Sequence, residues 1–120
     1  MVTLKLPCEM LDVELFVTED GTAPFANWFE GLPADVADRV RVALLRMERG
    51  NLGDHKSVGQ GVSEARLHFG PGFRLYFGRD GQKLIVLLIG GSKRSQARYV
   101  KAAQLLWKRY KARKRRQPWH

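Results

Sequence analysis

The sequence is nearly free of cysteine, since Cys8 is the only one in 120 residues. An internal disulfide and a cysteine-rich zinc site are therefore excluded. Long apolar runs are also missing: nothing approaches the roughly 20 residues that a helix needs to cross a bilayer, and the opening MVTLKLPCEML lacks the apolar run of a signal peptide. We expect a cytoplasmic protein with no membrane contact, and the length favours a single domain over residues 1–120.

Acidic residues are missing from the last quarter of the chain. Residues 92–120 contain eleven Lys or Arg and neither Asp nor Glu, whereas residues 1–91 contain ten cations and all twelve acids. The net charge of +9 therefore comes from a basic C-terminal helix and tail that begin at about residue 95. Such asymmetry favours a polyanionic partner, either nucleic acid or an acidic protein segment. The alternative is a basic tail that serves only solubility.

The first 50 residues predict a strand and two helices. Apolar side chains alternate along residues 11–17, with Leu11, Val13, Leu15 and Val17 on the buried side. A short helix follows, with Thr22 as its cap, Pro24 in its first turn and Gly31 at its end. A second helix runs from Pro33 to Gly50, and its apolar residues recur at helical spacing: Val36, Val40, Leu44 and Met47. Since one or two residues join the helices, they should form a hairpin.

Three strands and a last helix are predicted after a glycine-rich loop at residues 51–61. The strands cover residues 64–69, 73–77 and 84–89, and turns at GPG (70–72) and RDGQ (79–82) join them. The third strand has no polar face, which is typical of a central strand covered on both sides. The last helix runs to about Tyr110, with residues 112–120 frayed. The predicted fold is α+β, a helical hairpin on a mainly antiparallel four-stranded sheet.

Basic side chains should gather on the outward face of this sheet. Arg66 and His68 share that face of one strand, and Arg74 and Tyr76 share it on the next strand. Glu64, on the first of these strands, is the one acid expected on this face. Neighbouring strands lie about 4.8 Å apart, so we expect one patch.

Further cations lie beside this patch in the sequence. Lys56 is in the loop before the first of these strands, and Lys93 and Arg94 directly follow the last one. Gly90 and Gly91 are expected to form a tight turn that places Lys93 at the edge of the patch.

These residue types suit RNA cleavage without a metal. A ribose 2′-hydroxyl can attack the adjacent phosphate if a base, an acid and positive charge are at hand. His68 is the only histidine predicted on the patch, and no metal-ligand spacing or cofactor motif is present. The structural alternatives are that Arg74 forms an ion pair with Glu64, that His68 faces water and that Tyr99 packs.

Two segments resemble the RelE/ParE superfamily of toxins: LGDHKSVGQGVSEARLHFGPGFRLYF (52–77) and LIVLLIGGSKRSQARYVKAA (84–103). They are most similar to the HigB-like addiction module killer branch of type II toxin–antitoxin systems. The resemblance implies a microbial-ribonuclease-like sheet, a cognate antitoxin as partner, and metal-independent cleavage of mRNA on the ribosome, which inhibits translation. This sequence departs from the branch at three places. The branch commonly has Asp at the position of Ser92 and a cysteine near Ile89, and its members usually lack the long basic ending after Trp107.

The resemblance also implies site residues. The active-site cations of the family fall on Lys56, Arg66, Arg74 and Lys93, and a tyrosine falls on Tyr99. With His68 these are the candidate catalytic residues, and the candidate RNA-binding residues are Arg94, Arg98, Lys101 and Lys108. Two other functions remain open: a ParE-like toxin that acts on gyrase or another protein without cutting RNA, and a basic nucleic-acid-binding module.

Overall fold

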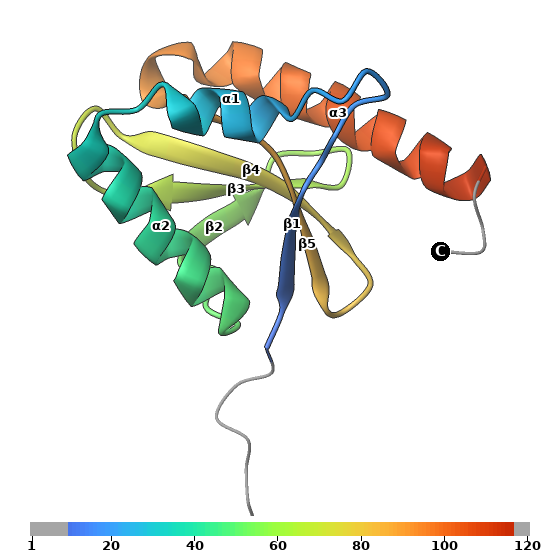
Figure 1. Cartoon of the computed structure of the whole chain (residues 1–120), viewed down its shortest axis with the longest axis horizontal. Coiled ribbons are helices and arrows are strands. Elements are labelled where there is room, and N and C mark those ends of the chain that lie inside the picture. The colour runs from blue at the N-terminus through green and yellow to red at the C-terminus, as the bar shows by residue number, and fades with distance from the viewer. Residues whose placement is uncertain (1–9, 117–120) are drawn as a thin grey trace, which may run out of the picture.

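The computed structural model describes residues 10–116, in which five strands form one mixed sheet. β1 (Asp12–Leu15) lies at one edge and is parallel to β5 (Leu84–Ser92). The other neighbours are antiparallel, in the order β5, β4 (Phe73–Asp80), β3 (Val62–Leu67) and β2 (Asp54–Ser57) (Figure 1). The α+β class is confirmed, but the prediction of four strands is wrong. β2 was missed because all four of its residues are exposed and it carries no apolar alternation.

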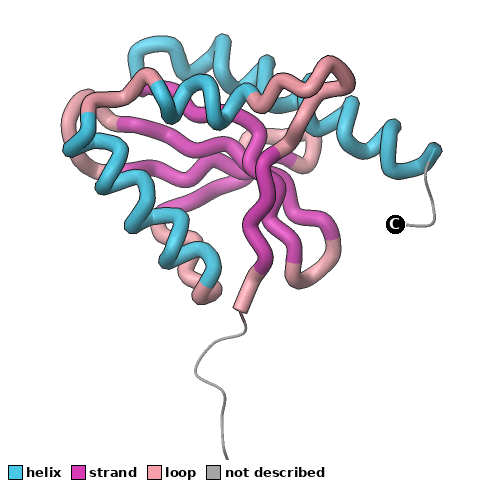
Figure 2. The backbone as a smooth tube through the Cα atoms, in the orientation of Figure 1, coloured by secondary structure: helices cyan, strands magenta, loops and turns pink. Residues whose placement is uncertain are grey.

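The helices cover both faces of the sheet (Figure 2). α1 (Pro24–Glu30) and α2 (Ala34–Glu48) pack on one face, as predicted, through Phe25, Val40 and Met47. A 3₁₀ turn at residues 93–95 leads into α3 (Gln96–Arg116), which packs on the other face through Ala103, Leu106 and Trp107. Because α3 occupies that face, the predicted open cationic surface is partly covered.

The central strand is β4, and β5 lies between it and β1. The prediction that residues 84–89 form the central strand is therefore wrong, because their strand lies one place away from the centre. Their burial on both faces is confirmed. Ile85 and Leu87 pack towards α1 and α2, and Val86 and Leu88 pack towards α3.

Four local predictions need correction. In the first strand Leu15 and Val17 are exposed, and Phe16 turns to the α3 face, where it is 2% exposed. The cap of α1 is Ala23, and the Thr22 amide instead hydrogen-bonds to the Thr18 hydroxyl at 3.2 Å. Residues 112–116, predicted to be frayed, are helical, and residues 117–120 lie outside the described part of the chain, as do Cys8 and the remainder of residues 1–9.

The fourth correction concerns Gly90 and Gly91, which lie inside β5 and form no turn. A Cβ on Gly90 would lie 2.2 Å from the Trp28 ring, and a Cβ on Gly91 would lie 2.4 Å from the Tyr99 ring. The two glycines therefore admit one aromatic ring on each face of the sheet. That close approach, on the faces covered by α1 and α3, explains why glycine is needed here.

Candidate functional site

Three neighbouring strands place cations on the face that α3 partly covers. Lys56 of β2 is paired with Glu64 of β3, and Arg66 of β3 is paired with Arg74 of β4. Directly opposed residues of antiparallel strands point to the same face. The strand register therefore brings these four side chains to one side of the sheet.

The polar side chains on this face differ in how far they are exposed to solvent. Glu64 and Tyr76 are fully buried and Arg74 is 7% exposed, so the prediction that they face outward is wrong. α3 lies over them, which the sequence patterns of the strands did not indicate. Arg66 keeps 35% of its side chain exposed, and Lys56 is exposed on β2.

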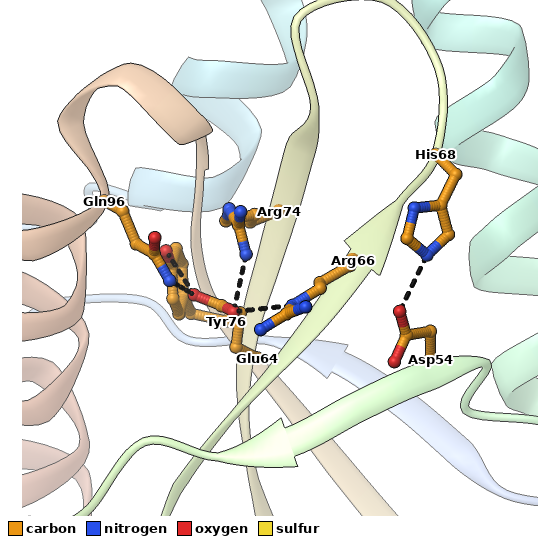
Figure 3. Close-up of polar contacts among 7 residues, drawn as sticks. All are labelled: Asp54, Glu64, Arg66, His68, Arg74, Tyr76 and Gln96. Carbon is orange, nitrogen blue, oxygen red and sulfur yellow. Dashed lines mark hydrogen bonds and ion pairs between the residues drawn. The ribbon is translucent and has the colours of Figure 1, made fainter.

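Glu64 is the centre of the polar cluster (Figure 3). Its Oε1 accepts a hydrogen bond of 2.8 Å from Arg74 Nη1, and its Oε2 accepts bonds of 3.0 Å from the Tyr76 hydroxyl and 2.8 Å from Gln96 Nε2. Arg66 Nε lies 3.5 Å from Oε1. The structural alternative for Arg74, an ion pair with Glu64, is therefore confirmed. Because Gln96 is the first residue of α3, the same carboxylate also fixes the start of that helix.

The pKa values of this cluster follow from its burial. Burial alone would raise the pKa of Glu64, but the hydrogen bonds from Gln96 and Tyr76 and the charge of Arg74 outweigh it and lower the pKa below the usual value. Burial and the hydrogen bond to Glu64 raise the pKa of Tyr76 well above that of a free tyrosine. Glu64 is thus a carboxylate and Tyr76 a neutral phenol at neutral pH.

Glu64 does not use every donor of the two arginines. Arg74 donates to it through Nη1, and Arg66 approaches it with Nε at 3.5 Å. Within residues 10–116, the buried Nε atoms of both arginines form no hydrogen bond. Buried donors of this kind are usually satisfied in a native protein, and an unsatisfied one points to a ligand or an ordered water. The two guanidinium groups are therefore suited to bind an anion.

An open pocket of about 430 Å³ lies where these side chains end. Arg66, Arg74, Lys93 and His68 contribute to its lining, together with the turn at residues 70–72. The amide of Lys93 donates a hydrogen bond of 2.8 Å to the Gly72 carbonyl, which holds the start of the 3₁₀ turn against that hairpin. Three of the four predicted active-site cations thus line one opening. Lys56 does not line it, although the register places it beside Glu64 on the next strand.

His68 is paired with a carboxylate that the sequence analysis did not include. Its Nε2 lies 2.7 Å from Asp54 Oδ2, and both side chains are exposed (Figure 3). The expectation that Glu64 is the only acid near the patch is therefore wrong. Asp54 was missed because it lies on β2, the strand that the hydrophobic pattern does not predict.

Tyr99 is partly buried and packs in the cluster beneath α3, beside Gly91. Arg98 lies over its ring at 5.6 Å. The packing alternative for Tyr99 is therefore confirmed, and a catalytic role for it stays a prediction.

The candidate RNA-binding residues follow the outer side of the last helix. Arg94 is in the 3₁₀ turn, and Arg98, Lys101 and Lys108 recur on α3 at helical spacing. All four are exposed. They form a basic stripe that begins next to Lys93.

The C-terminal part of α3 is bound to the rest of the structure. Asp80, at the end of β4, accepts a hydrogen bond of 2.5 Å from the Tyr110 hydroxyl and pairs with Lys114. Arg113 Nη1 donates to the Val17 carbonyl at 2.7 Å. The bonds from Lys114 and Tyr110 lower the pKa of Asp80 below its usual value. Part of the basic ending is therefore a structural clamp, which the sequence did not predict.

Neither a metal centre nor a membrane segment is evident in the part of the chain that the structure describes. Residues 10–116 contain no group of three or more His, Cys, Asp or Glu placed to hold a metal ion. None of the helices in this range is long and apolar enough to cross a bilayer.

The fold and the pocket define a small, basic α+β protein with a cationic opening on its sheet. Residues 27–111 match the family of phage-derived Gp49-like proteins (DUF891), and the chain belongs to this family. The family is one of RelE/ParE-like toxins of toxin–antitoxin systems, so an antitoxin is the implied partner. An uncharacterized protein of Haemophilus influenzae is 36% identical over 86 residues, which cover 71% of this chain and 87% of the relative. The resemblance to RelE/ParE toxins is thus confirmed at the level of the toxin family.

Proposed function

We propose that this protein is the toxin of a type II toxin–antitoxin system of the HigB-like kind and an mRNA endonuclease that works on the ribosome without a metal. A cognate antitoxin neutralises it in the cytoplasm, and the whole chain acts as one domain. The observation that carries the proposal is the pocket in which Arg66, Arg74 and Lys93 surround one opening with His68 at its rim. Three cations around one site match the charge that builds up on a phosphate during cleavage.

The proposed reaction uses the RNA's own ribose. The 2′-hydroxyl attacks the adjacent phosphorus, its proton leaves to a base, and the bond to the 5′-oxygen breaks as that oxygen takes up a proton. The products are a 2′,3′-cyclic phosphate and a 5′-hydroxyl end. Positive charge from Arg74, Arg66 and Lys93 stabilises the pentacoordinate phosphorane, and a neighbouring cation on Lys56 adds to the field.

Proton transfer is assigned to His68. Its Nε2 is directed at Asp54, so in the neutral ring the proton lies on Nε2 and Nδ1 is free to accept one. Asp54 is therefore a positioning residue that fixes the ring and its tautomer. Tyr99, which packs beside Gly91 on the strand next to Arg74, is the alternative proton donor.

The test is expression in cells that lack the antitoxin. Lys93→Ala and Arg66→Ala should each relieve growth arrest, and the pair Lys93→Ala with Arg74→Ala should abolish it while antitoxin binding is kept. Arg79→Ala, an exposed arginine at the far end of β4, is the matched control and should remain toxic. If the double variant is as toxic as the wild type, the site is wrong, and if DNA breaks appear instead of RNA ends, the target is gyrase.

A second candidate function is binding of nucleic acid without cleavage. The exposed stripe of Arg94, Arg98, Lys101 and Lys108 favours it, because phosphate contacts of this kind are independent of sequence. Replacing all four by Gln should weaken RNA binding and flatten its salt dependence. If this change removes toxicity while Lys93→Ala does not, the binding function is favoured over the nuclease.

A further inference from the structure

A second cavity, of about 500 Å³, opens between α2 and the outer strands β2 and β3. It shares residues 66–69 with the cationic pocket, so the two adjoin across the end of β3. Arg66 and His68 contribute to both linings. A molecule whose phosphate occupies the cationic pocket can therefore reach this cavity around the end of β3.

The interior of the cavity is apolar and one of its walls is a planar cation. Met47, Leu52 and Ala65 are among the apolar lining residues. The Arg39 guanidinium lies 5.0 Å from the centre of the Phe69 ring. A guanidinium that lies over an aromatic ring can offer its other side to a second planar group, and nucleobases stack on arginine in this way.

Polar groups at the rim can bind the edge of such a base. Asn51 uses its carbonyl oxygen to accept from the Gly53 amide at 2.9 Å, which leaves the side-chain NH₂ group as a donor. Asp54 uses one oxygen for His68, and within residues 10–116 its other oxygen accepts no hydrogen bond. In that same range neither Arg39 nor Arg46 has an ion-pair partner. The rim thus offers donors, an acceptor and unneutralised positive charge.

We propose that this cavity binds the base of the RNA nucleotide next to the scissile phosphate. The base stacks on Arg39, its edge meets Asn51 and Asp54, and Arg46 contacts the adjoining phosphate of the backbone. An acidic peptide fits less well, because the Asp54 carboxylate forms part of the lining. The inference rests on the proposed function in one respect: it takes the phosphate in the neighbouring pocket to be the scissile phosphate of RNA.

Calorimetric titration with the four 3′-nucleoside monophosphates and with inorganic phosphate tests the site without requiring catalysis. The wild type should bind at least one nucleotide about tenfold more tightly than phosphate, because stacking on a base adds to the phosphate contacts. Arg39→Ala should remove about that tenfold gain and leave phosphate binding unchanged. Arg39 is exposed, so the variant should fold, which circular dichroism checks.

Arg41→Ala is the matched control. It makes the same change on the same helix, but Arg41 pairs with Asp38 at 2.6 Å and lies over Phe29, outside the cavity. The control should bind nucleotides and phosphate like the wild type. If Arg39→Ala and Arg41→Ala weaken nucleotide binding equally, or neither weakens it, the proposed base site is wrong.

The outcomes separate this inference from the proposed nuclease. If the wild type cuts RNA but binds 3′-nucleotides no more tightly than phosphate, the base site fails and the nuclease stands. If nucleotides bind in the expected manner and no RNA is cut, the nuclease fails and the base site stands. For an active enzyme, Arg39→Ala should also reduce the base preference next to the cut sites, whereas an unchanged preference would contradict the proposal.

Discussion

Arg74 of β4 and Glu64 of β3 form an ion pair of 2.8 Å that is almost completely closed to solvent. Glu64 also accepts hydrogen bonds from Tyr76 and from Gln96 at the start of α3. One carboxylate thus connects the strand that carries Arg74 with the helix that follows Lys93. The same contact stabilises the fold and sets the direction in which the arginine presents its remaining donors.

Replacing Glu64 by Gln should destabilise the protein by about 3 kcal/mol, because it leaves the buried Arg74 charge without its counter-ion. Urea unfolding measures this loss. The variant should also lose activity, since neither Arg74 nor the start of α3 would be held in place.

Tyr76→Phe is the matched control, because it removes one hydrogen bond from the same carboxylate and keeps the charges. It should cost about 1.5 kcal/mol, in the range of one bond to a charged group, and should leave RNA cleavage nearly unchanged. Equal losses of stability and activity in the two variants would contradict the positioning role of Glu64.

Stability should fall at both ends of the pH range. The pKa of Glu64 is lower in the folded protein than its usual 4.5, so its contribution is complete above that value and is lost as the pH falls through the folded pKa. The pKa of Tyr76 is raised above its usual 10.0, so its contribution is complete below pH 10 and is lost as the pH rises through the folded pKa.

Thermal unfolding from pH 2 to 12 measures both limbs. Glu64→Gln should flatten the acidic limb in part, since the pKa of Asp80 is lowered as well. Tyr76→Phe should flatten the alkaline limb in part, since the pKa of Tyr110 is raised as well. Variants whose limbs coincide with those of the wild type would show that these groups do not carry the pH dependence.

Gly90→Ala should destabilise the fold by about 3 kcal/mol, as expected for forced overpacking. Its Cβ would lie 2.2 Å from the Trp28 ring, which is held between α1 and the sheet. Gly31→Ala makes the same change at the end of α1, where the nearest atom is 3.6 Å away, and should shift stability by at most about 0.5 kcal/mol. Similar unfolding midpoints for the two variants would refute the close approach.

Asp80→Asn should weaken the clamp on α3 by about 1 kcal/mol, because it removes the charge that pairs with Lys114. Hydrogen exchange should accelerate in the last two turns of α3 and remain unchanged in β4. Asp38→Asn, which removes an exposed pair with Arg41, should have little effect on either measure. If the exchange rates along α3 in Asp80→Asn equal those of the wild type and of Asp38→Asn, the contact of Asp80 with α3 contributes nothing to stability.

The sequence predicts the elements with strong apolar periodicity. α2, β3, β4, β5 and the start of α3 lie close to where spacing and turn residues put them, because their burial leaves a regular pattern. β2 has four exposed residues and no such pattern. By alternation Phe16 lies on the face opposite Val13, but the sequence did not predict that it is buried there under α3.

The sequence indicated which side chains would lie near one another better than it indicated their environment, although Lys56 does not line the pocket. Arg66, Arg74, Lys93 and His68 line one pocket, as expected from the predicted sheet and from the place of Lys93 directly after its last strand. Burial under α3 was not predictable from the strands, since a face that carries Glu64, Arg74 and Tyr76 has the composition of an exposed one. The pairing of His68 with Asp54 depends on β2 and was missed with it.

The most direct test of the account is the chemistry of RNA ends after induction of the toxin in cells without antitoxin. The wild type should produce new mRNA fragments with 5′-hydroxyl and 2′,3′-cyclic phosphate ends, and Lys93→Ala should remove at least about 99% of them, a loss typical of an electrostatic catalyst. If the wild type produces no such ends, or if Lys93→Ala produces as many as the wild type, the pocket formed by Arg66, Arg74 and Lys93 is not a nuclease site.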